Sequence, residues 1–346
     1  MSSSLPKVSV LIPTYNYARY LPETIESVLG QDFKDYEIIV SDDASSDDSA
    51  DIIRRYAARE PRIRAQLNAS NLGMVANWNW CLKEARGEHV KFLFGDDCLA
   101  SPRALGRMAA LLDANPGATI AASARFILDE NSNVTGLWDD FGRPGLHDGP
   151  RVIARCLRKN VNLIGEPSTV MFRRIAGLRG FDPRLRQIVD LEMWFHLLQQ
   201  GDLAYTTEPL CVFRRHVGQQ TVVNSQSRVG DREMVRLLAE SLVSMSFRER
   251  AGLGPLAYRR ILFRSLYYLN KSGSTDPDFM ALSALLRKEI PLPWRILCWV
   301  LHRVTRPAEN LRRAVRLFRL REAAQVATEQ RDFLAALRSK RAVPGP

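Results

Sequence analysis

The stretch Gly87-Glu88-His89-Val90-Lys91-Phe92-Leu93-Phe94-Gly95-Asp96-Asp97 joins an apolar run to two adjacent carboxylates. Residues 90–94 are β-branched and aromatic enough for a central strand. A charged pair directly after a buried strand is costly unless something cationic meets it. We therefore expect a buried strand that delivers Asp96 and Asp97 to a site at the edge of a sheet.

A divalent metal ion is one cation that would balance this pair. Mg²⁺ and Mn²⁺ bind carboxylate oxygens and keep open coordination positions, which suit the oxygens of a diphosphate. The alternative is that Asp96 and Asp97 only cap the helix expected after Ser101-Pro102, because Asp is common near helix starts. The local sequence leaves both interpretations open.

The whole chain has the size and composition of a globular protein with an anionic partner. Its 346 residues, 46% of them hydrophobic and 25% charged, are enough for one large α/β domain with an appendage or for two domains. The net charge of +11 indicates nucleic acid, nucleotide phosphates or an acidic membrane face as the partner.

Targeting signals and cysteine frameworks are not expected. Residues 1–7 have no apolar core of signal-peptide length, and no segment reaches the roughly 20 apolar residues that span a bilayer. We therefore expect a cytoplasmic protein. The five cysteines are scattered and never form a CxxC arrangement, so neither a disulfide framework nor a structural zinc site is expected.

Two further strands are predicted before the central one. Residues 8–12 form an apolar run stopped by Pro13, a helix is expected over 21–29, and residues 36–40 form the next strand before Asp42 and Asp43. Strand, helix and strand in this order make a βαβ unit, and open parallel sheets bind ligands outside the carboxyl ends of their strands. The ends at 13–15, 42–43 and 96–97 should therefore converge.

The expected sheet lacks both common phosphate-binding loops. Neither GxGxxG nor GxxxxGK[ST] occurs, so acidic and aromatic loop ends must do the binding. Asp43 can accept a hydrogen bond from a base N–H or a ribose hydroxyl, and Tyr15 can lie flat on a base. The alternative for residues 42–47 is a solvated turn and helix cap.

Four motifs in order make a specific resemblance: VSVLIPTYN (8–16), IVSDDASSDDS (39–49), NLGMVANWN (71–79) and ARGEHVKFLFGDD (85–97). Together they resemble the N-terminal half of the inverting family 2 glycosyltransferases, which share the glycosyltransferase A fold. The resemblance continues through residues 177–182, 190–194 and 213–216 and covers about residues 6 to 220. It implies an α/β protein with a Rossmann-like, mostly parallel sheet flanked by helices and followed by a C-terminal helical extension.

The resemblance also implies roles for individual residues in a nucleotide site. It places Pro13 and Tyr15 in the nucleotide pocket, Asp43 at the base, Asp96 at the ribose and Asp97 on Mn²⁺ or Mg²⁺.

One departure from the family pattern affects the metal site. Many relatives carry another Asp two positions before the acidic pair, where this chain has Phe94. Metal ligation would then rest mainly on Asp97.

The second half of the implied site begins with a helix near residue 189. Asp190 falls in its first turn, where the helix dipole stabilises a carboxylate, and Glu192 points to a different face. Only one of the two can readily enter a pocket. Family position favours Asp190 as the general base, and the alternative is a helix cap.

An RxH motif follows the base helix. Arg214 and His216 match it, so Arg214 is expected to grip phosphate and His216 to complete the metal or diphosphate contacts. An isolated His is more often structural, and this alternative for His216 stays open. Residues 165–172 match the acceptor-side strand of the family, and the polar loop 138–145 is either an acceptor cover or a surface connection.

The resemblance implies a metal-dependent, inverting glycosyltransferase. It would move a sugar from a nucleotide-sugar donor, expected to be a UDP- or dTDP-sugar, to a hydroxyl of a glycan or lipid-linked acceptor in cell-surface polysaccharide or lipopolysaccharide synthesis. The alternative is a non-catalytic nucleotide- or glycan-binding scaffold of a membrane-associated polysaccharide assembly. Nucleic acid is not expected as a partner, because it explains the net charge but not the acidic loops.

From about residue 225 the pattern becomes helical and basic. We predict a catalytic domain over 1–224 and a basic helical region over 225–346. Trp294 and Trp299 suit a water–lipid boundary. The region either rests on the anionic inner face of the cell membrane or packs on the catalytic domain as an ordinary helical subdomain. Its two apolar stripes are Leu297, Val300, Leu301, Val304 and Leu311, Ala314, Val315, Phe318.

Overall fold

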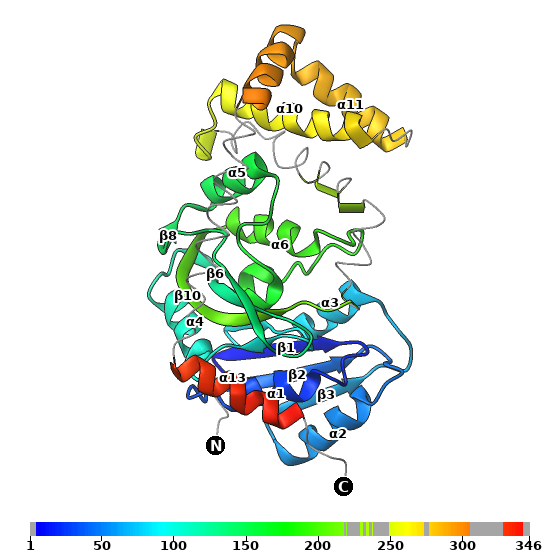
Figure 1. The fold of residues 1–346 in the computed structure, drawn as a ribbon, viewed down its shortest axis with the longest axis vertical. Helices are drawn as coiled ribbons and strands as arrows, with labels where there is room; N and C mark the ends of the chain where they lie inside the picture. The colour runs from blue at the N-terminus through cyan, green and yellow to red at the C-terminus, as the bar shows by residue number, and fades with distance from the viewer. Residues whose placement is uncertain are drawn as a thin grey trace.

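The apolar runs of the sequence form one ten-stranded mixed sheet in the computed structural model (Figure 1). The structure describes residues 5–217, 219, 229–230, 233–234, 237, 249–272, 277–304 and 328–341. The strands are β1 (Val8–Thr14), β2 (Tyr36–Asp42), β3 (Ile63–Leu67), β4 (His89–Phe92), β5 (Cys98–Leu99), β6 (Ala118–Leu128), β7 (Val134–Trp138), β8 (Gly145–His147), β9 (Val170–Arg173) and β10 (Asp202–Arg214). Their order is β3-β2-β1-β4-β9-β6-β10-β5, with β7 on β6 and β8 on β10.

Helices cover both faces of this sheet. On one face lie α3 (Met74–Glu84), α5 (Gly149–Lys159) and α6 (Val189–Leu198), and on the other α1 (Leu21–Leu29), α2 (Ser49–Arg59) and α4 (Ala104–Asp113). Each helix set buries its apolar residues against the strands in its own cluster. The result is the three-layered α/β arrangement that the sequence predicts.

The N-terminal half of the sheet is parallel, as expected from the βαβ pattern. Leu11 of β1 lies between Ile39 of β2 and Phe92 of β4, and both pairs are parallel. The strand β3 was not identified from the sequence, because its pattern Ile-Arg-Ala-Gln-Leu is short, polar and half-exposed, as suits an edge strand.

β9 runs antiparallel to both of its neighbours, β4 and β6. Lys91 pairs with Met171, so the residues before β9 lie beyond the carboxyl end of β4. The amide of Phe94 donates to Oγ of Ser168 at 3.1 Å, which fixes this contact. One antiparallel strand thus carries the turn 166–169 to the edge where the acidic pair lies.

The C-terminal region divides into two parts (Figure 1). α10 (Pro255–Ser272), α11 (Pro277–Glu289) and the helical residues 292–304 form a lobe beyond α5. α13 (Thr328–Arg341) instead packs on α1, with Leu334 and Leu337 buried against Cys98 and Phe126. The division at residue 224 stays a prediction, but α13 packs as a part of the catalytic half.

Two statements about the tail follow from the described residues. None of the helices within them has the length and hydropathy needed to cross a bilayer. The first predicted stripe, over 297–304, is helical, whereas the second, over 311–318, lies outside the described residues.

Candidate active site

The carboxyl ends of β1, β2 and β4 meet at one edge of the sheet. Thr14 lies in register with Asp42, and the amide of Asp43 donates to the carbonyl oxygen of Thr14 at 3.0 Å. The turn after β4 passes so close that a Cβ on Gly95 would lie 2.7 Å from Oγ1 of Thr14 and 3.1 Å from the ring of Tyr17. A larger residue there would force Thr14 to shift, and the acidic pair lies beside the end of β1.

Asp43 is buried and organises the loop that precedes α3. Its Oδ1 accepts hydrogen bonds from the amide of Leu72 at 2.8 Å and from Nδ2 of Asn68 at 3.1 Å, and its Oδ2 accepts from the amide of Gly73 at 3.0 Å. A carboxylate has about four acceptor positions, so Oδ2 retains one for a ligand N–H or O–H. Tyr15 on the neighbouring loop is 48% exposed.

Asp96 forms a buried contact with His216. Its Oδ2 lies 3.0 Å from Nε2 of His216, and the imidazole packs against Tyr17 and Tyr20 with ring centroids 5.9 and 5.1 Å away. The structure thus brings the RxH motif to the acidic pair, as the resemblance implies.

Asp97 has one engaged oxygen and one that has no partner. Oδ1 accepts a hydrogen bond of 2.9 Å from the amide of Arg214, while Oδ2 is buried and makes no hydrogen bond to the described residues. Burial raises the pKa of Asp97 well above its usual range, and the charge of Asp96 adds to this. A buried carboxylate oxygen beside a second carboxylate fits a divalent cation, because the cation would remove both penalties.

Phe94 cannot take the place of the missing family carboxylate. Its ring stacks on Trp78 of α3 at 4.8 Å, and Trp78 also meets Phe181 edge-on at 5.2 Å. The position therefore contributes to an aromatic wall beside the acidic pair that follows β4.

The buried side chain of Arg214 joins the acidic pair to neighbouring protein groups. Its guanidinium is fully buried and bonds the carboxylate of Glu23 at 2.9 Å, Oγ of Ser132 at 2.6 Å and the carbonyl oxygen of Asp96 at 2.7 Å. It also lies 4.8 Å from the ring centroid of Tyr20. This placement differs from the expected phosphate contact, because the donors face protein groups. Glu23 was not identified from the sequence, which gives no signal for a partner in β10.

Asp190 lies in the first turn of α6, where the sequence places it. Its Oδ1 accepts from the amide of Leu191 at 2.7 Å, and its Oδ2 accepts from Nδ2 of Asn162 at 3.0 Å. Burial raises the pKa of Asp190 to about 7, and the charge of Glu166 adds to the rise. A carboxyl group that exchanges its proton near neutral pH is suited to general base catalysis.

Glu166 connects the two halves of the site. Its charge raises the pKa of both Asp97 and Asp190, so it lies within electrostatic reach of each. The guanidinium of Arg125, buried in β6, holds it with Nε at 2.6 Å from Oε2 and Nη2 at 3.0 Å from Oε1. Neither Glu166 nor Arg125 was identified from the sequence. The only signal was a Glu before Pro167, just ahead of the acceptor-side strand.

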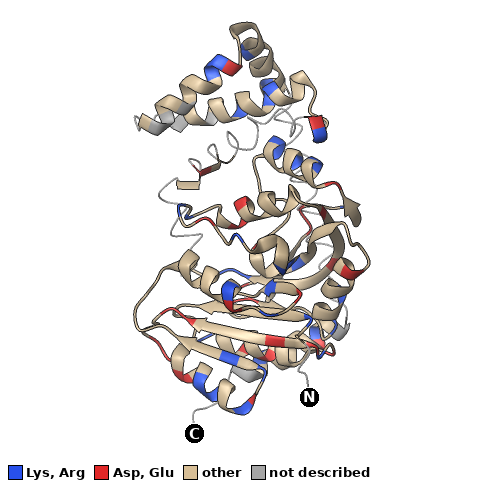
Figure 2. Cartoon of the chain, turned by 180° about the vertical axis from the view of Figure 1, so that it is seen from behind, with Lys and Arg blue, Asp and Glu red and all other residues tan. Residues whose placement is uncertain are grey.

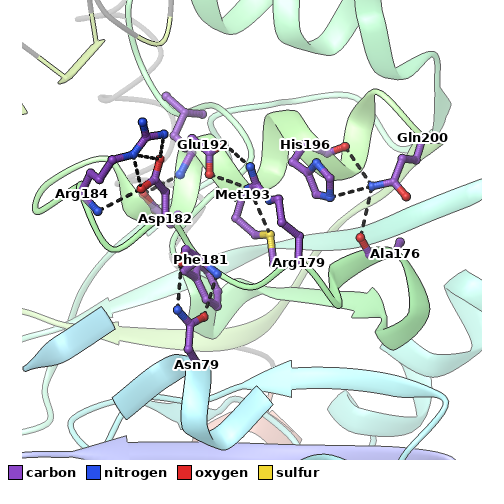
Figure 3. Close-up of polar contacts among 12 residues, drawn as sticks. Asn79, Ala176, Arg179, Phe181, Asp182, Arg184, Glu192, Met193, His196 and Gln200 are labelled. Carbon is purple, nitrogen blue, oxygen red and sulfur yellow. Dashed lines mark hydrogen bonds and ion pairs between the residues drawn. The ribbon is translucent and has the colours of Figure 1, made fainter. Parts of the chain in front are cut away.

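Glu192 is engaged away from Asp190, as the helical spacing predicts. Arg179 holds its carboxylate through two hydrogen bonds of 2.8 and 2.7 Å (Figure 3). In the same view, the side chain of Asn79 on α3 bonds both backbone groups of Phe181, at 2.9 and 2.7 Å. These contacts fix the segment that leads into α6.

Another acidic group lies at the opposite end of β4. Glu88, His89 and Asp113 have ligand atoms within 4.8 Å of one another. The ammonium of Lys7 already lies 2.9 Å from Glu88 and 2.8 Å from Asp113, and Nη1 of Arg173 lies 3.5 Å from Glu88, so two cations balance the two carboxylates without a metal ion.

Comparisons with known sequences identify the family of this chain. The profile of the family described as glycosyl transferase family 2 matches residues 9–176. The putative glycosyltransferase EpsE of Bacillus subtilis is 31% identical over 214 residues, which are 60% of this chain and 72% of that protein. A GalNAc(5)-diNAcBac-PP-undecaprenol beta-1,3-glucosyltransferase of Campylobacter jejuni is 45% identical over 98 residues, 28% of this chain and 32% of that protein.

Solved structures show the same fold. TarS 1–349 of S. aureus in complex with UDP-GlcNAc has a TM-score of 0.59 at 19% identity and covers 83% of this chain and 82% of its own. The mannosyltransferase PcManGT of Pyrobaculum calidifontis in complex with GDP-Man and Mn²⁺ has a TM-score of 0.54 at 17% identity, over 98% of this chain and 87% of its own. The fold is that of the glycosyltransferase A enzymes, and the chain belongs to glycosyl transferase family 2.

Proposed function

We propose that the protein is a metal-dependent, inverting glycosyltransferase. It moves a sugar from a nucleotide-sugar donor to a hydroxyl of a glycan or lipid-linked acceptor in cell-surface polysaccharide or lipopolysaccharide synthesis. The observation that carries the proposal is the turn 165–169, which is bonded on both sides. Oγ of Ser168 accepts a 3.1 Å hydrogen bond from the amide of Phe94, just before the acidic pair, and Nδ2 of Asn162 donates to both the carbonyl oxygen of Gly165 and Oδ2 of Asp190 at 3.0 Å. These contacts support a single site for Asp97 and Asp190.

Asp97 would hold Mn²⁺ or Mg²⁺ through Oδ2, which makes no hydrogen bond to the described residues, and His216, bonded to Asp96, would complete the contacts. A bound divalent ion stabilises the charge of a departing diphosphate. The ligands bound by two structural neighbours, UDP-GlcNAc in TarS and GDP-Man with Mn²⁺ in PcManGT, support this assignment. Arg214 holds the acidic pair in place. Contact with the phosphates would then be made by the metal ion and not by Arg214.

Asp190 removes the proton from the attacking hydroxyl. Its oxygens are oriented by Leu191 and Asn162, and its pKa of about 7 leaves a large unprotonated fraction at neutral pH. Attack from the face opposite the diphosphate inverts the anomeric carbon in one displacement. Glu166 is bound by Arg125, which disfavours it as a second nucleophile for a retaining route.

Donor recognition is assigned to the ends of β1 and β2. Pro13 and Tyr15 line the nucleotide, and Asp43 accepts from the base through its remaining oxygen position, with a UDP- or dTDP-sugar expected. Thermal shifts with UDP, dTDP, GDP and CMP, each with Mn²⁺ or Mg²⁺, test this. UDP or dTDP with metal should give the largest rise in Tm. Equal small shifts for all four would contradict the donor assignment.

Contact with the anionic inner face of the membrane is the second part of the proposal. On the helix 292–304, Leu292, Ile296, Trp299, Val300 and Val304 are between 43% and 70% exposed. Lys and Arg recur along the neighbouring helices of the lobe (Figure 2), and Arg303 lies 5.2 Å from the ring centroid of Trp299. Exposed apolar side chains with basic neighbours are typical of interfacial helices.

Flotation with anionic vesicles tests this contact on the full-length protein. The double variant Ile296→Glu/Val300→Glu should lose vesicle binding. Ile175→Glu is the control, because Ile175 is 74% exposed but lies in the catalytic half. Equal flotation of the double variant and the wild type would contradict the proposal.

A further inference from the structure

A segment of the C-terminal region reaches the start of the base helix. Residue 233 lies beyond the family match at 9–176 and beyond the sequence resemblance, which ends near residue 220. The carboxylate of Glu233 nevertheless accepts three hydrogen bonds from consecutive backbone amides: Arg186 at 2.6 Å, Gln187 at 2.8 Å and Ile188 at 3.0 Å. These amides immediately precede α6, and Asp190 lies two residues after the last of them.

Two further contacts show that this segment is packed onto the site. Glu233 is only 8% exposed, and Leu237 is buried in the same core cluster as Leu191 of α6. Gly230 approaches the preceding loop so closely that a Cβ there would lie 2.8 Å from Cγ of Gln187. The three hydrogen bonds therefore belong to a packed contact between the segment 230–237 and the start of α6.

In this contact a carboxylate anion, that of Glu233, is bound by successive backbone N–H groups. Three consecutive N–H groups that converge on one carboxylate fix the backbone of residues 186–188. Hydrogen bonds to a charged acceptor are about twice as strong as neutral ones. The opposite end of this loop is held by Asn79, which bonds Phe181 (Figure 3). Glu233 fixes the end next to the helix.

We propose that Glu233 is a positioning residue for the transfer step. By binding the amides of residues 186–188 it holds the first turn of α6, and with it Asp190, in the orientation that attack requires. The inference rests on the proposed role of Asp190 as the base. It makes the C-terminal region a part of the catalytic site, beyond any role at a membrane.

The test uses full-length Glu233→Gln and Glu233→Ala. Nucleotide release is measured for the donor that the wild type hydrolyses with Mn²⁺, together with the Tm shift on adding nucleotide and Mn²⁺. We expect kcat to fall roughly 10- to 100-fold, as for a misplaced catalytic group, with donor KM and the Tm shift unchanged. Gln should retain more activity than Ala, because its amide oxygen still accepts from the backbone.

Two further variants make the test specific. Gly230→Val adds bulk at the contact with Gln187, which displaces the segment without changing Glu233, and should lower kcat in the same way. Glu289→Gln is the control, because that carboxylate is exposed at the end of α11, and it should behave as the wild type.

Unchanged kcat in both Glu233 variants would overturn the inference. So would a parallel loss of kcat, donor binding and Tm, since that pattern marks a purely structural residue. A wild-type protein that releases nucleotide from no donor would contradict the proposed function and the inference with it. An active wild type with fully active variants would contradict the inference alone.

Discussion

The backbone amide of Arg214 donates a 2.9 Å hydrogen bond to Oδ1 of Asp97, so the last residue of β10 orients the carboxylate that follows β4. The same residue binds the carbonyl oxygen of Asp96 through Nε at 2.7 Å. One buried arginine thus fixes both members of the acidic pair, and Oδ2 of Asp97 makes no hydrogen bond to the described residues.

Replacing Asp97 by Asn should remove the metal-dependent stabilisation by nucleotide. Asn keeps an oxygen for the amide of Arg214 but loses the charge that a divalent ion needs. The measurement is the Tm shift with UDP or dTDP and Mn²⁺. Glu88→Gln is the control, because Glu88 belongs to the group whose carboxylates are balanced by Lys7 and Arg173, and its metal-dependent shift should persist. A shift that survives Asp97→Asn but not Glu88→Gln would move the metal site to the other end of β4.

The same substitution should stabilise the metal-free protein at neutral pH. The folded-state pKa of Asp97 is raised, so the charged carboxylate costs stability as the pH rises above about 4, its usual pKa. Asn carries no such cost. Urea unfolding with a chelator present should give Asp97→Asn a higher free energy of unfolding at pH 7 than the wild type. A lower value would show that the charge is already balanced inside the protein.

Asp190→Asn should keep donor binding and lower nucleotide release by about 10²- to 10⁴-fold, the usual contribution of a general base. In the wild type, kcat should rise with pH and level off above about 7, because only the unprotonated carboxylate accepts a proton. The checks are a Tm shift with nucleotide and a pH–rate profile. Retained transfer by Asp190→Asn would mean that another group is the base.

Glu166→Gln should move the rising limb of that profile to lower pH. The negative charge of Glu166 raises the pKa of Asp190, so a neutral side chain should let Asp190 lose its proton earlier. Glu192→Gln is the control, since its carboxylate is engaged by Arg179, and its limb should stay in place. If Glu166→Gln leaves the rising limb of the pH–rate profile unchanged, Glu166 lies too far from Asp190 to raise its pKa.

Arg214→Met should destabilise the protein by about 3 to 5 kcal/mol, because it leaves Glu23 charged and buried without its ion-pair partner. The double variant Glu23→Gln/Arg214→Met should recover part of this loss. Urea unfolding measures both. A loss below about 1 kcal/mol for the single variant would show that the pair is weakly coupled.

The sequence predicted those parts of the fold that local patterns determine. The apolar strands β1, β2 and β4 and the helices α1, α4 and α6 lie where the strand patterns and helix starts of the sequence place them. The edge strand β3 and the packing of α13 on α1 were not predicted, because neither follows from a local pattern.

In the candidate site, too, local sequence patterns predicted some features and not others. The strand ends that carry Asp43 and Asp97 were predicted to converge because parallel strands align their carboxyl ends, and the structure brings both to β1. The pairing of Arg214 with Glu23 and of Glu233 with residues 186–188 joins residues far apart in sequence. Only the folded chain brings these partners together. From the RxH motif alone, Arg214 was therefore predicted to bind phosphate, whereas in the structure it pairs with Glu23.

The most direct test of the account is nucleotide release from UDP-, dTDP-, GDP- and CMP-sugars by the full-length protein, with Mn²⁺ and with a chelator. We predict release from a UDP- or dTDP-sugar that requires Mn²⁺ and is lost in Asp97→Asn and Asp190→Asn. A folded wild-type protein that binds a nucleotide but releases none from any donor would contradict the account and favour a non-catalytic scaffold.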